Sequence, residues 1–161
     1  MSVNKYLPHV FVLPEDDANR QLANGFHLQV DSARQRQMQV LEVAGGWIEV
    51  LDRFKSDHIS QMDKYQNRFI ALLIDFDGKK DRLDEAKAVI PNHLIERVLI
   101  LGVSTEPERL RANLGRSYEQ IGGEVAEDCR IGSDTTLMHD LLRHNVSELN
   151  RLRDHVRPIL F

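Results

Sequence analysis

Disulfide-forming cysteines and long apolar segments are both missing from this chain of 161 residues. The single cysteine, Cys129, excludes an internal disulfide and a zinc site built from several cysteines, and it fits a reducing compartment. No apolar run approaches the roughly 20 residues that span a bilayer. The N-terminus also lacks the basic start and long apolar segment of a secretory signal. We therefore expect a cytoplasmic protein without membrane contact.

An excess of positive charge is missing as well. The chain has 21 Lys and Arg against 25 Asp and Glu, a formal net charge of -4. Sequence-independent affinity for nucleic acid comes from basic side chains that neutralise phosphates, so any such contact should be local or shared with a partner. Zinc is not indicated either, because His139, His144 and His155 do not have the i, i+4 spacing of a zinc-binding helix.

Alternating apolar patterns indicate the fold class. One domain is the most economical organisation for this length. Short apolar segments predict four strands, at residues 10–13, 38–44, 69–74 and 98–103. Helical patterns lie between them, at residues 17–24, 47–65 and 81–90, the first ending at Asn24-Gly25. The alternation predicts an α/β fold, a Rossmann-like three-layer sandwich with a mostly parallel four-stranded sheet.

The C-terminal third has a different pattern. Residues 119–132 contain Gly122-Gly123 and Gly132, which predict a loop with at most a short helix. Ser133 or Asp134 can cap a final amphipathic helix that extends to about Val156. We expect its apolar stripe to pack on the domain, with a homodimer or partner-protein contact in addition.

The stretch from Phe69 to Gly78 is the centre of the functional interpretation. Six apolar residues end abruptly at Asp75 and Asp77, as expected of a strand buried on both faces. Ligands of parallel sheets bind beyond the carboxyl ends of the strands. Residues i and i+2 of a strand share a side, so both carboxylates should point together and repel unless a proton or cation lies between them. The alternative is a turn at Asp77-Gly78 with Asp75 as a helix cap.

Other strand ends supply further polar groups. Glu15 follows the first strand, and Gly45-Gly46 follow the second, where the backbone must turn sharply or be approached closely. Glu106 and Glu108 follow the fourth. Basic residues are close to these acids in the sequence: Lys79, Lys80, Arg82, Arg109, Arg111 and Arg116.

The order of Glu15, Gly45-Gly46 and Asp75-Phe76-Asp77 at successive strand ends resembles the TOPRIM domain, the metal-dependent fold of topoisomerases, primases and several small nucleases. The resemblance covers about residues 9–110 and leaves 111–161 as an extension. It implies that Glu15 acts as a general acid/base or metal ligand and that Asp75 and Asp77 hold Mg²⁺. Glu106 is similar to the acids that overcoming-lysogenization-defect nucleases place around a second metal. In the family a glycine often follows the glutamate, whereas here Asp16 does.

The chemistry of these residues agrees with that resemblance. Carboxylates suit Mg²⁺ or Mn²⁺, and such a cation lowers the pKa of an attacking water. Lys79, Lys80, Arg82, Arg109 and Arg111 can meet phosphate oxygens. The sequence therefore predicts a Mg²⁺-dependent or Mn²⁺-dependent nuclease, or a related phosphoryl-transfer enzyme, acting on DNA or RNA.

Three alternatives remain open. An acidic pair after the first strand and a phosphate-accepting Asp75 would resemble a response-regulator receiver, although no lysine follows Lys87 where a receiver has one. DFDG is similar to the nucleophile motif of haloacid-dehalogenase phosphatases, but Lys79 stands in place of the expected threonine. The chain could also be a noncatalytic TOPRIM-like subunit of a larger complex.

Overall fold

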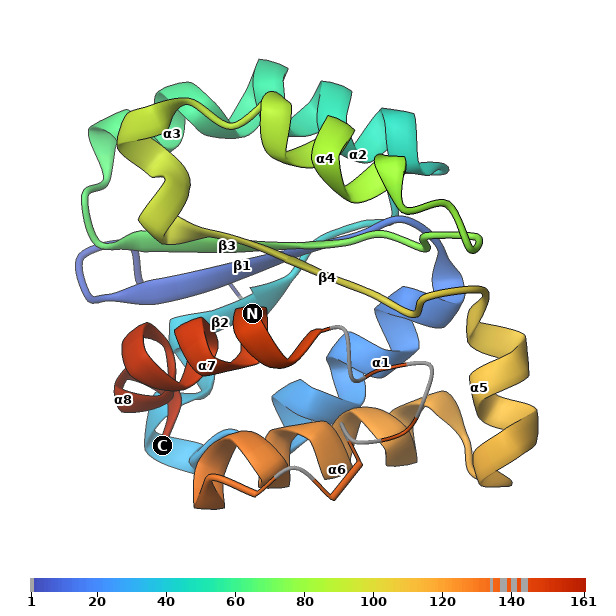
Figure 1. Ribbon diagram of the computed structural model, residues 1–161. Helices are drawn as coiled ribbons and strands as arrows, with labels where there is room; N and C mark the ends of the chain where they lie inside the picture. The colour runs from blue at the N-terminus through green and yellow to red at the C-terminus, as the bar shows by residue number, and fades with distance from the viewer. Residues whose placement is uncertain (1, 134, 137–138, 140–141, 143–144) are drawn as a thin grey trace.

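Four parallel strands form one central sheet in the computed structural model, which describes residues 2–133, 135–136, 139, 142 and 145–161. The order across the sheet is β2-β1-β3-β4. The strands are β1 (His9–Pro14), β2 (Met38–Val40), β3 (Arg68–Leu73) and β4 (Val98–Leu101). Helices cover both faces, so the predicted Rossmann-like three-layer α/β fold is confirmed (Figure 1). β2 and β4 are shorter than the apolar runs that predicted them.

One face of the sheet carries the helices that follow β2 and β3 (Figure 1). The segment after β2 is continuously helical, as predicted, but a π-helical turn that the sequence did not indicate lies in its middle. Val50, Phe54 and Met62 from this segment are fully buried against the sheet. The elements are α2 (Trp47–Arg53), the π turn η2 (Phe54–His58), α3 (Ile59–Lys64), α4 (Asp81–Ala88) and η3 (Asn92–Arg97).

The other face is covered by the remaining helices. Leu110, Ile121, Leu149 and Leu160 from four of them meet one apolar layer beneath the sheet. These elements are α1 (Asp17–Leu28), η1 (Ser32–Gln37), α5 (Pro107–Leu114), α6 (Tyr118–Ile131), α7 (Val146–His155) and α8 (Arg157–Leu160). No helix among the described residues is both long and apolar enough to cross a membrane.

Two glycine-based predictions are wrong. Asn24-Gly25 does not end α1, which continues to Leu28, and residues 118–131 form the long helix α6 rather than a loop. A Cβ on Gly25 would lie 2.0 Å from the carbonyl oxygen of Glu119, and one on Gly122 would lie 1.9 Å from that of Leu22. These glycines therefore let α1 and α6 pack backbone to backbone, and they do not break either helix.

The bounds of the final helix also differ from the prediction. α7 begins at Val146 rather than near residue 134, and the predicted cap Asp134, like Met138, Leu141 and His144, lies outside the described residues. The other predicted cap, Ser133, donates its hydroxyl to the Asp128 carboxylate at 2.6 Å. The apolar stripe of α7 and α8 packs against the sheet, as expected. A contact to a second copy or a partner remains a prediction.

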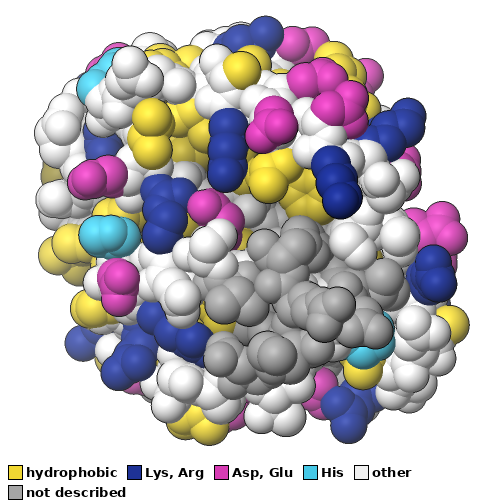
Figure 2. All heavy atoms as spheres, viewed as in Figure 1, with side chains coloured by type: hydrophobic (Ala, Val, Ile, Leu, Met, Phe, Trp, Pro, Cys, Tyr) yellow, Lys and Arg dark blue, Asp and Glu magenta, His cyan; other side chains and the backbone are white. Residues whose placement is uncertain are grey.

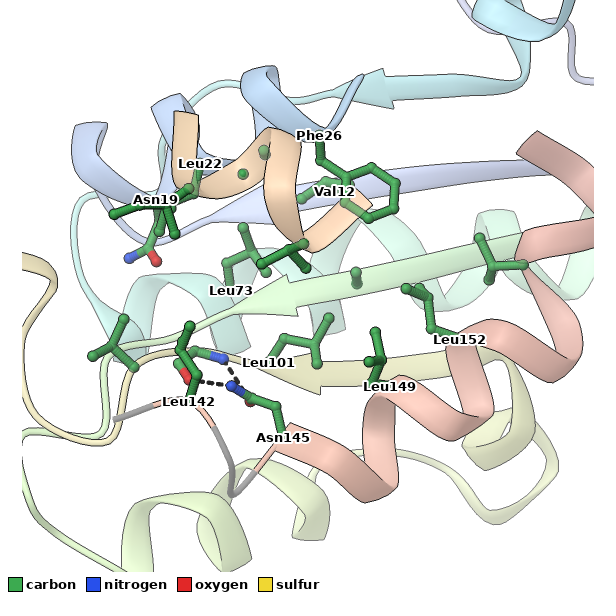
Figure 3. Close-up of a pocket in the computed structure, with 18 of the residues that line it drawn as sticks. Val12, Asn19, Leu22, Phe26, Leu73, Leu101, Leu142, Asn145, Leu149 and Leu152 are labelled. Carbon is green, nitrogen blue, oxygen red and sulfur yellow. Dashed lines mark hydrogen bonds between the residues drawn. The ribbon is translucent and has the colours of Figure 1, made fainter. Parts of the chain in front are cut away.

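Side chains of the C-terminal segment pair with the open edge of β4. Glu148 accepts a hydrogen bond from the Ile100 amide at 2.9 Å. Asn145 accepts from the Gly102 amide at 3.1 Å and donates to its carbonyl at 2.8 Å (Figure 3). These bonds satisfy main-chain groups that a fifth strand would otherwise bind, so they protect the edge from pairing with another chain.

An apolar cavity of about 120 Å³ lies between the sheet and the helices α1, α6 and α7 (Figure 3). Leu22, Leu73, Leu101 and Leu149 are among its lining residues. Ligand sites usually have about 300–1,000 Å³, so this space is too small for a typical ligand. We interpret it as a packing void and not as a ligand site.

Candidate functional site

The strand order creates a natural binding point between β1 and β3. The chain leaves β1 toward β2 on one side and later returns to form β3 on the other. Crossover connections therefore diverge at the carboxyl ends of β1 and β3, and ligands of doubly wound sheets bind at such switch points. Glu15 follows β1 directly, and its amide donates to the Leu73 carbonyl at the end of β3 at 2.9 Å. Both predicted acidic loops thus meet at one place.

Glu15, Asp16, Asn19 and Asp75 form a connected polar cluster at this point. The Asp75 amide donates to Glu15 Oε2 at 2.7 Å. The Asn19 side-chain amide donates to Asp75 Oδ1 and to Asp16 Oδ1, each at 3.1 Å. Asp16 also caps α1 by accepting from the Asn19 main-chain amide at 3.0 Å. The first turn of α1 therefore connects the carboxylate of Asp16, which follows β1, with that of Asp75, which follows β3.

The electrostatics of the cluster favour a bound proton or cation. Burial, reinforced by the charges of Asp16 and Glu15, raises the pKa of Asp75 to about 8 although the Asn19 hydrogen bond opposes the change. Burial also raises the pKa of Glu15; the Asp75 amide opposes this, and the charges of Asp16 and Asp77 add to it. Only 7% of Asp75 is exposed. Carboxylates this close and this dry resist ionising together unless a positive charge joins them.

Asp77 is arranged differently from Asp75. β3 ends at Leu73, and Asp77 has a left-handed backbone with φ of 49°, so the predicted strand alternation does not reach it. Its side chain is 54% exposed and pairs with Arg82 of α4 at 3.3 Å. Asp75 is instead bonded to Asn19 of α1. The two carboxylates share an edge of the sheet but are held by helices on opposite faces.

Arg82 is the buried positive charge of this edge. Its Nη1 donates to the Asp75 carbonyl at 2.5 Å, and its guanidinium lies 4.8 Å from the centre of the Trp47 ring. Among the described residues nothing accepts a hydrogen bond from its Nε, although the residue is only 6% exposed. Sequence reasoning grouped Arg82 with surface phosphate contacts, whereas it forms part of the wall of the site.

Main-chain hydrogen bonds bring the second and fourth strand ends to the same place. The Gly45 amide donates to the Glu15 carbonyl at 2.9 Å, and Gly45 has a φ of 100°, a left-handed conformation that favours glycine. Gly46 then precedes α2. The Asp77 amide donates to the Thr105 carbonyl at 3.0 Å, so Glu106 follows the contact directly.

The predicted basic residues lie around this edge. Lys79 and Lys80 are exposed between Gly78 and the start of α4, and Arg109 and Arg111 are exposed on α5. In the part of the chain that the structure describes, none of these four side chains forms a hydrogen bond or ion pair with Glu15 or Asp75. Their role as phosphate contacts remains a prediction.

Asn19 is the main site residue that sequence reasoning missed. It is 1% exposed and is the link between Asp16 and Asp75. The available signal was the Asp16-x-x-Asn19 spacing, typical of a cap that bonds the third residue of a helix. That pattern locates a helix start but does not reveal that the Asn19 side chain reaches a strand 56 residues away in the sequence.

The described residues contain no group of three or more His, Cys, Asp or Glu side chains arranged to hold a metal. Glu15 is used by the Asp75 amide, and Asp77 is turned toward Arg82. A hard cation such as Mg²⁺ commonly takes only one or two carboxylates and keeps several waters. The charge of Asp77 raises the pKa of Glu15, so the two carboxylates are near enough to interact, and a metal held by them remains a prediction.

Comparisons of the chain with protein-family models, curated proteins and solved structures gave no significant match. The TOPRIM interpretation therefore remains a hypothesis that rests on the residues at the strand ends.

Proposed function

We propose that this protein is a Mg²⁺-dependent or Mn²⁺-dependent phosphodiesterase that cleaves nucleic acid at the switch point between β1 and β3. The observation that carries the proposal is the meeting of the buried Asp75 and the half-buried Glu15, linked by a hydrogen bond, with pKa values both raised by burial, at the position where such sheets bind ligands.

The acidic residues have three roles in this proposal. A bound divalent cation would neutralise charge on the phosphodiester and activate a water. Glu15 and the more exposed Asp77 would hold the cation. Glu15, with its raised pKa, is also suited to accept a proton from the attacking water. Asp75 positions Glu15, because its main-chain amide donates to that carboxylate.

Substrate contact should be local rather than spread over the surface. Acidic and basic side chains are interspersed over the face seen in Figure 2, and the net charge of the chain is -4. Long-range attraction of a polyanion is therefore weak. The exposed Lys79, Lys80, Arg109 and Arg111 near the acidic edge are the proposed contacts.

A cleavage assay tests the proposal. Labelled single-stranded and duplex DNA and RNA are incubated with the protein in Mg²⁺, Mn²⁺ or EDTA. We expect cleavage of at least one substrate with metal only, and a loss of about 100-fold or more in Glu15→Gln and Asp77→Asn. Asp63→Asn is the matched control, because Asp63 is half exposed and pairs with His93 at 2.7 Å. Absence of metal-dependent cleavage on all four substrates would reject the enzyme and favour a noncatalytic subunit.

A receiver-like phosphoacceptor is the second candidate. The sheet order β2-β1-β3-β4 matches the start of the order found in receiver domains, and Asp75 follows β3. The buried position of Asp75 and its bond to Asn19 make phosphate transfer to it less accessible. Labelling by acetyl phosphate in the wild type but not in Asp75→Asn would favour this candidate.

A further inference from the structure

A polar pocket lies between α5 and α6, outside the acidic cluster. Its volume is about 470 Å³, within the range of about 300–1,000 Å³ that is typical of ligand sites. Its polar lining comes from the guanidinium groups of Arg111 and Arg116, the carboxylate of Glu108, Ser117 and Tyr118. We call it the α5–α6 pocket.

Local sequence chemistry shapes this pocket. Gly115 ends α5 in a left-handed conformation with φ of 63°, and the chain turns into α6 over residues 115–117. Ser117 then caps α6: it accepts from the Gln120 amide at 3.2 Å, and its own amide donates to the Gln120 side chain at 2.9 Å. This capping box fixes the turn. Arg111, from the last turn of α5, and Arg116 consequently line the same hollow.

Both arginines are held but remain accessible. Arg116 pairs with Glu124 at 2.5 Å, and half of its side chain is exposed. The exposed Arg111 lies 5.3 Å from the centre of the Tyr118 ring. Exposed ion pairs contribute little free energy to stability, so a phosphate can displace Glu124 from Arg116 with a small loss of free energy. The described lining residues Arg111, Arg116 and Glu108 have a formal charge of +1, which becomes available to a ligand when Glu124 is displaced.

Tyr118 connects the pocket to the acidic edge. It is only 7% exposed, and burial together with the charges of Glu108 and Asp16 raises the pKa of its hydroxyl. The charge of Asp16 reaches Tyr118, and Asp16 belongs to the Glu15–Asp75 cluster. Figure 1 shows α5 at the same end of the molecule as the loop from β3 to α4. One extended ligand can therefore contact both places.

We propose that the α5–α6 pocket binds a backbone phosphate of the nucleic acid strand, next to the phosphodiester at the acidic edge. This proposal rests on the proposed function. The planar forks of Arg111 and Arg116 match phosphate oxygens in geometry and charge. A phosphate held by two guanidinium groups would add to the contacts at the acidic edge and help an acidic chain bind a polyanion without a broad basic surface.

Binding without metal tests the pocket separately from catalysis. The probe is a short fluorescein-labelled single strand, made as DNA and as RNA, and its fluorescence anisotropy is measured in EDTA over a range of salt concentrations. We expect Arg111→Gln combined with Arg116→Gln to weaken binding about tenfold or more and to lower the slope of log K against log salt by about 1. Arg130→Gln is the control, since Arg130 lies near the other end of α6 and also pairs with a neighbouring acid, Glu127. It should bind as the wild type does.

A neutral-phosphate scan identifies the contact. Methylphosphonate replaces one phosphate of the DNA strand at a time, and each strand is tested with the wild type and with the double arginine variant. One position should weaken binding to the wild type and have no further effect on the variant, which is the coupling expected of a direct contact. Equal losses in both proteins at every position would overturn the proposal, as would wild-type affinity in the double variant or undetectable wild-type binding to either strand.

The outcomes separate the two proposals. Arginine-dependent binding without metal-dependent cleavage would retain the pocket and reject the enzyme. Cleavage that depends on Glu15 and metal, with binding unaffected by the two arginine substitutions, would retain the enzyme and reject the pocket.

Discussion

Replacing Asp75 by asparagine should remove a large pH dependence of stability. Burial, with the charges of Asp16 and Glu15, raises the pKa of this carboxyl from 3.8 to about 8. Between those values the folded protein holds a proton that the unfolded chain releases. The resulting stabilisation is fully present below pH 3.8 and is lost as the pH rises through about 8.

The size of the effect follows from the pKa difference. Within that window each pH unit changes the free energy of unfolding by up to about 1.4 kcal/mol for one group. From pH 5 to pH 7 the wild type should therefore lose up to about 3 kcal/mol through Asp75. For a domain of this size that corresponds to roughly 6–12 °C in Tm.

Asparagine is a close mimic of the protonated acid. Its carbonyl can still accept from Asn19, and its amide can donate toward Asp16 as the acid proton does. Asp75→Asn should consequently be more stable than the wild type at pH 7 and about equal to it near pH 4, with Asp63→Asn as the exposed control.

Urea unfolding in EDTA at several pH values measures this difference. Parallel profiles for wild type and Asp75→Asn would refute the reasoning, because they would mean that Asp75 titrates alike in the folded and unfolded states. Added Mg²⁺ should stabilise the wild type more as the pH rises, since a cation competes with protons for the carboxylates.

Three further predictions concern the fold. In thermal unfolding, Gly122→Ala should destabilise the protein by about 1–3 kcal/mol or more, because the new Cβ clashes with the main chain of α1. The neighbouring Gly123→Ala should be neutral or stabilising, because the atoms nearest to its Cβ are 3.6 Å away. Glu148→Ala should cost about 1–3 kcal/mol and speed hydrogen exchange at the Ile100 amide, which loses its acceptor; unchanged exchange would contradict the edge-protection role. Burial lowers the pKa of His9 from 6.5. The stability that the neutral His9 ring contributes is therefore lost as the pH falls below 6.5. NMR should show the His9 ring still neutral at a pH where exposed histidines are already protonated.

The sequence by itself determined the layered fold and the location of the acidic edge. Unbroken apolar runs before Glu15 and Asp75 identify strands buried on both faces, because such strands need no polar alternation. Parallel strands with helices between them place their carboxyl ends on one side. Both inferences use only local patterns and the handedness of crossovers, so they did not need the tertiary structure.

Tertiary structure alone decided how the parts meet. Gly25 and Gly122 have the same local signal as a helix break, and only the approach of α1 to α6 gives them another role. The Asp75 and Asp77 side chains diverge because β3 ends at Leu73 and helices from opposite faces supply Asn19 and Arg82 as partners. Contacts between residues distant in the chain depend on how helices and strands pack, and no local pattern records that packing.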